Sequence, residues 1–188
     1  MTTKATAGRS TAEAQRRRIT TCAVAVFART GYHATPVTEV AEAAEVSPAY
    51  IFRLFPGKLG LFVAAVEHCY SRVATVLTEA GERASAAGPR ERLEAMTAAY
   101  VELIADRDLI MLQAHAQSAC EVPEIRSAVR RGLAGVVTAV TNVSGAPDAA
   151  VQRFIAYGQL CHLIVQTDLD GEPASWARTL TAGIAHPA

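Results

Sequence analysis

Residues 35–58, TPVTEVAEAAEVSPAYIFRLFPGK, contain two short segments of helical pattern joined by a tight break. Thr35 and Ser47 are both good capping residues and each precedes a proline, a combination that is typical of a helix start. Apolar side chains follow at helical spacing, and a Pro-Gly pair ends the second segment. Two short helices joined by a turn predict a helix-turn-helix.

The segment before this motif predicts a longer helix. Ser10 and Glu13 form a capping-box pattern, apolar residues then recur at helical spacing, and Gly31 follows as a stop. Residues 1–10, rich in Thr, Ala, Gly and Ser, are expected to form a flexible arm. The arginines at positions 16–18 are open to two interpretations, a solvated helix start or a nonspecific clamp on a polyanion.

Composition favours helices throughout the chain. Hydrophobic residues make up 51% of its 188 positions and aromatic residues only 6%, while 38 positions are alanine. Alanine has the highest helix propensity, whereas sheets favour β-branched and aromatic residues. Further blocks of helical pattern lie at residues 58–86, 89–107, 108–120, 123–143, 147–169 and 173–184. We therefore predict an all-α protein of about nine helices, with an N-terminal domain at 1–57 and a larger domain at 58–188.

Charge is divided unevenly along the chain, although 18 basic and 18 acidic residues balance overall. Residues 1–60 carry eight basic and four acidic side chains, whereas residues 61–188 carry ten and fourteen. A basic segment indicates a polyanionic partner. The N-terminal part is therefore the predicted site for nucleic acid.

The sequence contains no pattern that indicates a membrane protein, a secreted protein or an enzyme. Its longest charge-free stretch, residues 132–147, is too short and too polar to span a bilayer, and no signal-peptide pattern opens the chain. The four cysteines form no CxxC pair, and no catalytic or nucleotide-binding glycine motif is present. We expect a cytoplasmic protein that has reduced cysteines and needs no metal or other cofactor.

The residues in and around the helix-turn-helix stand at a spacing that a known family shares. They are Phe27, Gly31, Tyr32, Thr35, Val40, Ala41, Ala44, Val46, Ser47, Phe52, Phe55, Lys58 and Leu61. Through them, residues 15–62 resemble the N-terminal signature of the TetR (tetracycline repressor) family of bacterial regulators. The resemblance implies an all-helical homodimer in which three N-terminal helices bind DNA. A larger helical domain would then bind a small ligand and the second subunit.

Two positions depart from the family pattern. Members usually carry glycine in the turn where this chain has Glu45, and a left-handed backbone there would cost a non-glycine residue about 1–2 kcal/mol. Either the turn adapts or the domain tolerates the strain. Phe52 stands where the family usually has a tyrosine whose hydroxyl reaches a phosphate, so we expect only a packing role for it.

The resemblance and the position of the second short helix predict the residues that contact DNA. The N-terminal residues of such a helix enter the major groove, while flanking residues hold phosphates. Arg53 is open to two roles, a bidentate donor to guanine or a phosphate clamp, and Lys58 is expected to bind phosphate. Thr35 is also explained by helix capping alone. The predicted DNA-contacting residues are Thr35, Thr38, Ser47, Pro48, Ala49, Tyr50, Arg53 and Lys58.

Charge-free helical stretches in the second half of the chain predict a ligand cavity. Neutral polar residues interrupt apolar ones there, which is the mixture that a small-molecule site needs. The same residues are also explained as ordinary core. The predicted cavity residues are Met96, Tyr100, Leu103, Met111, Gln113, His115, Gln117, Phe154 and Cys161. We expect an apolar or amphipathic effector, because no charged cluster lies among these residues.

For the whole chain we predict a transcription factor and not an enzyme. By the resemblance, residues 147–169 and the helix that contains Trp176 pair with the same helices of a second copy. The expected partners are a pseudo-palindromic operator in double-stranded DNA and a small effector that releases a repressor from it. Two alternatives stay open: a thiol- or metal-responsive DNA-binding sensor that uses Cys and His side chains, and a helical scaffold without DNA function.

Overall fold

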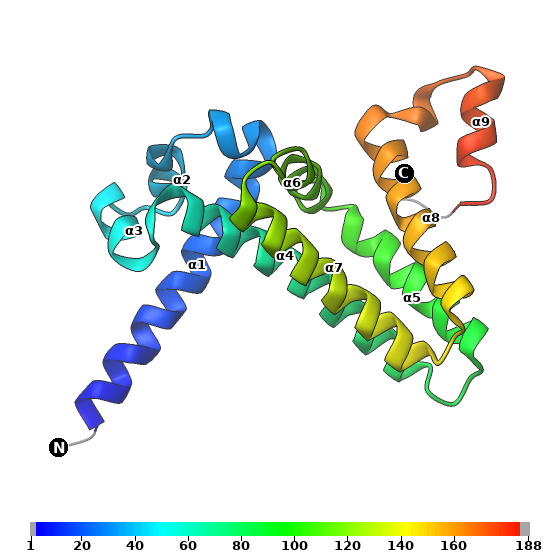
Figure 1. The fold of residues 1–188 in the computed structure, drawn as a ribbon, viewed down its shortest axis with the longest axis horizontal. Helices are drawn as coiled ribbons and strands as arrows, with labels where there is room; N and C mark the ends of the chain where they lie inside the picture. Colours follow the sequence, from blue (N-terminus) through cyan, green and yellow to red (C-terminus); the bar gives the residue numbers. More distant parts are fainter. Residues whose placement is uncertain (1–2, 185–188) are drawn as a thin grey trace. The chain divides into compact units, whose positions relative to one another are not determined.

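The computed structural model describes residues 3–184, with side chains from residue 12 onward (Figure 1). The helices are α1 (Thr3–Ala34), α2 (Val37–Ala43), α3 (Pro48–Leu54), α4 (Gly57–Arg83), α5 (Pro89–Ile104), α6 (Arg107–Ser118), α7 (Pro123–Ser144), α8 (Asp148–Thr167), the 3-10 helix η1 (Leu169–Gly171) and α9 (Ser175–Thr181). Nine α-helices and no strand within this described range confirm the predicted all-α fold. No single described helix is long and apolar enough to cross a membrane. Only when α3 and α4 are taken together, as a pair bent by 69°, is a described segment long and apolar enough.

Residue contacts divide the chain into two compact units. The first comprises Met1–Cys69 and Leu112–Val129, and the second comprises Tyr70–Met111 and Arg130–Ala188. Three helices, α4, α6 and α7, contribute residues to both units. The first unit is therefore discontinuous in sequence, because the end of α6 and the start of α7 belong to it together with the three N-terminal helices.

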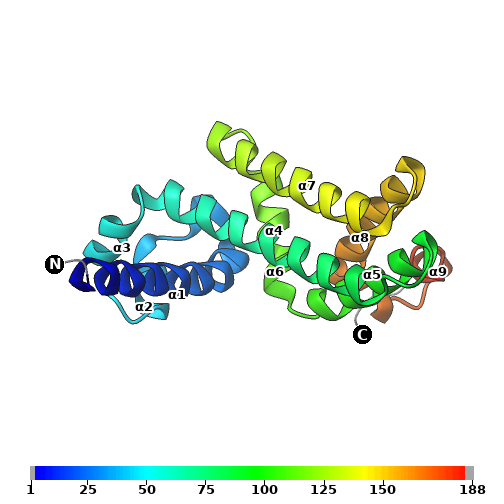
Figure 2. The same ribbon diagram turned by 90° about the horizontal axis from the view of Figure 1, so that it is seen from below.

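The core of the first unit is apolar and aromatic. Phe27, Val40, Ile51 and Phe62, from α1 to α4, are all fully buried. The rings of Phe27 and Phe62 meet edge to face, with centroids 4.9 Å apart. α2 contacts both α1 and α3, and Figure 2 shows the three helices together. Buried side chains of the two short helices thus hold α2 against both α1 and α3.

At its N-terminal end, α1 is longer than predicted. Its helical backbone starts at Thr3, so Ser10 lies inside the helix, and residues 3–10 are helical where we expected an arm. Gly31 interrupts the helical geometry (φ 72°, ψ −172°), which confirms the predicted stop. A Cβ at this position would lie 2.7 Å from His115 Nδ1, so close packing also requires glycine.

The two short helices begin differently. Ser47 caps α3 as predicted, because its Oγ accepts a hydrogen bond from the Tyr50 amide at 3.2 Å. The start of α2 differs from the prediction, since Pro36 occupies the N-cap position and no side chain caps the helix. Thr35 lies before this cap position and does not cap α2; its hydroxyl donates to the Gly31 carbonyl oxygen at 2.7 Å.

The turn between α2 and α3 keeps a left-handed backbone. Glu45 has a φ of 51°. The amide of Val46 donates to the Ala41 carbonyl oxygen at 2.9 Å, which closes the turn after Glu45. Of the two alternatives, the domain tolerates the strain, at a cost of about 1–2 kcal/mol.

In the second unit, close approach of α4 and α7 forms part of the packing. A Cβ at Gly132 would lie 2.3 Å from the Tyr70 ring, so only glycine lets the two helices pack at this distance. Arg92 of α5 donates hydrogen bonds to the carbonyl oxygens of Ser85 and Val143, at the ends of α4 and α7. α8 contacts both α5 and α9 (Figure 2). A cavity lies beside α5 and α8.

Candidate nucleic-acid interface and ligand cavity

One side of α3 is free of core contacts. Ile51 and Phe55 are buried, so the side chains between them lie on other sides of the helix. Besides Leu54, the exposed or partly exposed residues of α3 and its cap are Ser47, Pro48, Ala49, Tyr50, Phe52 and Arg53, and we define these six as the outer face of α3. The structure therefore brings the five residues predicted from this helix and its cap onto one accessible surface.

Two aromatic rings and a guanidinium group dominate the outer face of α3. The Arg53 guanidinium carbon lies 4.5 Å from the centroid of the Tyr50 ring, which makes a cation–π pair. Phe52 is 55% exposed, so the packing role expected for it is wrong. The buried stripe consists of Ile51 and Phe55, four residues apart, and Phe52 falls outside it. Phe52 therefore adds apolar surface beside a positive charge.

Arg16 of α1 holds the C-terminal end of α3. Its guanidinium carbon lies 4.3 Å from the centroid of the Phe55 ring, and the group donates a hydrogen bond to the Leu54 carbonyl oxygen. A cation at a helix C-terminus also offsets the partial negative charge there. Arg16 thus orients α3 from within the fold. Local sequence does not reveal this role, because the two bonded residues are 38 positions apart.

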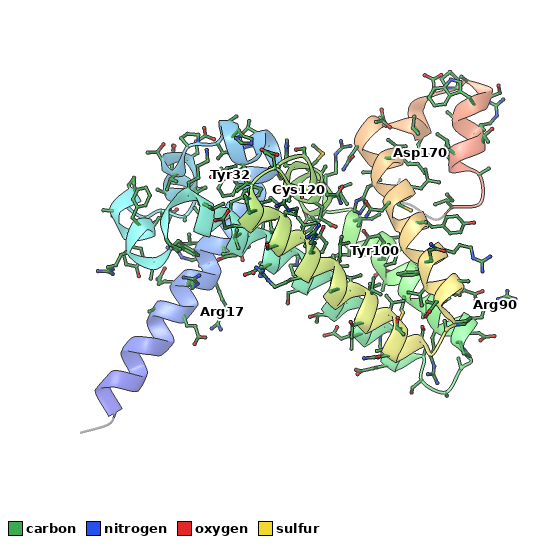
Figure 3. All side chains as sticks on the ribbon, viewed as in Figure 1. Arg17, Tyr32, Arg90, Tyr100, Cys120 and Asp170 are labelled. Atoms are coloured by element: carbon green, nitrogen blue, oxygen red, sulfur yellow. The ribbon has the colours of Figure 1, made fainter. Side chains whose placement is uncertain are left out.

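Lys58 and His33 tie the first turn of α4 to the end of α1. The Lys58 ammonium group donates to the His33 carbonyl oxygen at 3.0 Å and lies 5.2 Å from the ring centroid of Tyr32, which Figure 3 labels. His33 Nε2 lies 2.7 Å from Glu121 Oε1. A hydrogen bond from its own backbone amide, and then the bond to His33, lower the pKa of the Glu121 carboxyl. An ammonium group has three donors, so Lys58 retains donors for a phosphate.

The two threonines predicted near α2 lie in different environments. Thr35 is fully buried, and its hydroxyl oxygen lies 2.7 Å from the Gly31 carbonyl oxygen and 2.6 Å from Thr30 Oγ1. Its side chain would have to break both bonds to reach a phosphate, so the structure does not support the contact predicted at this position. Thr38 is exposed on α2.

A cavity of about 180 Å³ lies in the second unit, beside α5, α8 and the end of the described chain. Its lining residues are Thr97, Tyr100, Val101, Phe154, Tyr157, Gly158, Cys161, Gly183 and Ile184. The structure brings together three of the predicted cavity residues there: Tyr100, Phe154 and Cys161. Thr97 and Val101 are absent from the prediction, although Thr97 lies three residues before Tyr100 and four before Val101, and each of these spacings places the two residues on one side of α5.

The remaining predicted cavity residues do not line this cavity. They are Met96, Leu103, Met111, Gln113, His115 and Gln117. Met96 is fully buried in the second unit, where it is an ordinary core residue. His115 belongs to the first unit, and its ring packs against Gly31. The pattern of α6 could not reveal this, because the helix contributes to both units.

Tyr100 of α5, labelled in Figure 3, forms a hydrogen bond through its hydroxyl with Nε2 of His162 of α8. Burial lowers the pKa of His162 to about 4. The imidazole is therefore neutral near pH 7, and its Nε2 can accept the Tyr100 proton. Burial also raises the pKa of the Cys161 thiol, which keeps it protonated and weakly nucleophilic. The polar groups at this side of the cavity are thus uncharged.

Comparison with known proteins agrees with this arrangement. Residues 19–65 match the family model described as bacterial regulatory proteins, tetR family. No curated protein sequence matches the chain. Among solved structures, FadR from Bacillus subtilis, solved in complex with stearoyl-CoA, has a TM-score of 0.69 at 18% identity, over 87% of this chain and 94% of that one.

Two further solved structures have the same TM-score of 0.69. FadR from Bacillus halodurans is 19% identical over 92% of this chain and 97% of that one. A tetR-family regulator from Agrobacterium tumefaciens is 19% identical over 93% of this chain and 95% of that one. At these identities the likeness shows a shared fold. The family match covers the helix-turn-helix itself and confirms the resemblance seen in the sequence: residues 19–65 match the tetR family of bacterial regulatory proteins.

Proposed function

We propose that the chain is a transcriptional regulator that reads an operator in double-stranded DNA with the outer face of α3. The observation that carries this proposal is the exposure of Tyr50, Phe52 and Arg53 on one helix of a tetR-family segment. In a helix-turn-helix, the second helix presents its side chains to base edges in the major groove. Arg53 can donate two hydrogen bonds to guanine, and an aromatic ring can contact a thymine methyl group.

Flanking groups supply the proposed phosphate contacts. Thr38 is exposed on α2, and Lys58 lies in the first turn of α4, where helix amides also favour an anion. These phosphate contacts would position the protein on DNA without selecting a sequence. In this proposal the domain of residues 1–57, together with Lys58, binds DNA, and the domain of residues 58–188 binds the effector and a second copy of the chain.

The proposed active form is a homodimer. Leu163 on α8 and Trp176 on α9 are 46% and 55% exposed, and large apolar side chains of this kind are typical of interfaces. Two-fold symmetry would hold two α3 helices about 34–36 Å apart, which calls for a pseudo-palindromic operator. Light scattering should give twice 19.9 kDa, and a stable monomer would contradict the dimer.

The regulator is proposed to be a cytoplasmic repressor that a small molecule releases from DNA. The ligand-bound structure of FadR from Bacillus subtilis, which shares the fold, supports a ligand-responsive role. The effector must bind the DNA-free conformation more tightly, because equal affinity for both conformations shifts no equilibrium. A difference in affinity of about 100-fold supplies about 2.7 kcal/mol of coupling.

A titration with two DNAs tests the proposal. The purified full-length chain is titrated against DNA that flanks its own gene and against random DNA of equal length, across a series of salt concentrations. We expect binding that survives salt and competitor on the flanking DNA alone. Equal and steeply salt-dependent binding to both DNAs would leave only a nonspecific basic surface, and no binding at low salt would contradict the proposal.

A further inference from the structure

The cavity beside α5 and α8 limits its ligand by size. Its volume is about 180 Å³. Sites for drug-sized ligands have volumes of roughly 300–1,000 Å³. An engineered cavity of about 150 Å³ in another protein binds benzene. The cavity therefore accommodates one ring with a short substituent, and it is too small for a long acyl chain joined to a nucleotide.

The walls of the cavity are largely apolar. Tyr100, Phe154 and Tyr157 contribute aromatic rings, and Val101 and Ile184 contribute aliphatic surface. Among the described residues that line the cavity, none has a charged side chain. An ion moved into such a site loses its hydration without gaining a counter-charge from the walls, which is strongly unfavourable. The walls therefore select an uncharged ligand.

The hydroxyl groups at the cavity belong to Thr97, Tyr100 and Tyr157. The Tyr100 hydroxyl shares a hydrogen bond with Nε2 of His162, whose ring is neutral because burial lowers its pKa to about 4. Thr97 Oγ1 donates to the Leu93 carbonyl oxygen at 2.8 Å. Hydroxyl groups and a neutral ring therefore supply the polarity at this site.

We infer that this cavity takes a small uncharged molecule with a single aromatic ring. The inference rests on the proposed function only in making that ligand the effector. Gly158 of α8 opens the space for the ring, because a Cβ there would lie 3.4 Å from Tyr100 Cε1. A larger side chain at position 158 would extend into the volume that the ligand needs.

Three probes of similar size test the chemistry of the cavity. p-Cresol and 4-methylanisole are uncharged, and p-toluate carries a negative charge. Titration calorimetry on the full-length chain should show p-cresol and 4-methylanisole each binding about tenfold tighter than p-toluate. Stearoyl-CoA should not displace p-cresol. Equal affinity for p-cresol and p-toluate, or displacement of p-cresol by stearoyl-CoA, would overturn the inference.

A matched pair of substitutions locates the binding. Gly158→Leu fills the space beside Tyr100, whereas Gly135→Leu adds the same side chain to α7, where a Cβ meets nothing within 4 Å. We expect Gly158→Leu to weaken p-cresol binding at least about tenfold and Gly135→Leu to leave it unchanged. Unchanged binding by a folded Gly158→Leu variant would overturn the assignment.

A third variant tests the same cavity if Gly158→Leu does not fold. Phe154→Ala enlarges the cavity, so it should bind 2-naphthol more tightly than the unmodified chain does. A folded Phe154→Ala variant with unchanged affinity for 2-naphthol would contradict the inference. Such a result would mean that the Phe154 side chain does not limit the size of the ligand.

The operator titration distinguishes a failure of the cavity inference from a failure of the proposed function. A chain that binds its flanking DNA but neither p-cresol nor 4-methylanisole would overturn the inference and leave the regulator in place. A chain that binds p-cresol in the cavity but no DNA would support the inference and contradict the proposed function.

Discussion

The two compact units use their helices for opposite purposes. In the first unit, α3 is held by buried Ile51 and Phe55 and presents Tyr50, Phe52 and Arg53 to solvent. In the second unit, aromatic side chains from α5 and α8 line a cavity, and the histidine beside it is neutral. A surface that meets a polyanion needs exposed charge, whereas a site for a neutral ligand needs charge removed. A few residues on each helix therefore decide the role of the unit.

The largest expected effect comes from the core that supports α3. Phe27→Ala should lower the free energy of unfolding by about 3–5 kcal/mol, because it empties a fully buried site that contacts Phe62. Phe52→Ala is the matched control, since the same change at a side chain that is 55% exposed should cost little. Urea denaturation of both variants measures the difference. Equal losses would mean that Phe52 packs in the core, as the sequence suggested.

The next effect concerns the neutral histidine of the second unit. The His162 pKa is about 4 in the folded chain and near its ordinary value of 6.5 in the unfolded chain. The unfolded chain alone therefore binds a proton between these values, so stability present above pH 6.5 is lost as the pH falls toward 4. By pH 4 the expected loss is about 3 kcal/mol.

His162→Gln removes the titrating ring and keeps an acceptor for Tyr100. Urea denaturation at several pH values should show a shallower loss of stability for this variant between pH 6.5 and pH 4. Parallel curves for the variant and the unmodified chain would contradict a buried neutral histidine.

A smaller effect on DNA affinity distinguishes a residue that reads a base from one that binds phosphate in the first unit. Arg53→Ala should weaken operator binding by about 1–3 kcal/mol and leave random DNA nearly unaffected, if Arg53 reads a base. Lys58→Ala should weaken both DNAs alike. Arg90→Ala is the charge-matched control, because Arg90 belongs to the second unit. The salt-series titration measures all three, and equal loss on both DNAs for Arg53→Ala would make Arg53 a phosphate clamp.

The smallest effect is a gain in stability at the turn before α3. Glu45→Gly relieves a left-handed backbone with a φ of 51° and should stabilise the chain by about 1 kcal/mol. Glu45→Ala removes the same charge and keeps the strain, so it should bring no such gain. Thermal unfolding compares the two variants, and equal melting temperatures would show that the charge, not the backbone, limits stability here.

Local sequence signals predicted helix boundaries in the first unit, but they did not predict where all of its side chains lie. The Ser47 cap and the stop at Gly31 are properties of neighbouring residues, and the structure contains both. The left-handed turn at Glu45 was one of two alternatives that the family resemblance left open. The cap at Thr35 and the packing of Phe52 were wrong, because other elements decide where those side chains lie. Arg16 at the end of α3 had no local signal at all.

In the second unit, periodicity predicted helices and apolar faces but only part of the cavity. Tyr100, Phe154 and Cys161 line it, whereas Met96 on the same helix as Tyr100 is buried core. An apolar residue at helical spacing has the same pattern in both cases. Whether it meets another side chain or an empty space depends on the helix opposite.

The order of residues along the chain suffices for the helical fold, the helix-turn-helix and the basic N-terminal part, because helix propensity, capping and charge act between near neighbours. Tertiary packing alone decides that Phe52 is exposed, that Arg16 binds the end of α3 and that His162 is neutral beside a small cavity. These properties depend on burial and on contacts between distant segments. Burial is set by the whole unit and not by any stretch of its sequence.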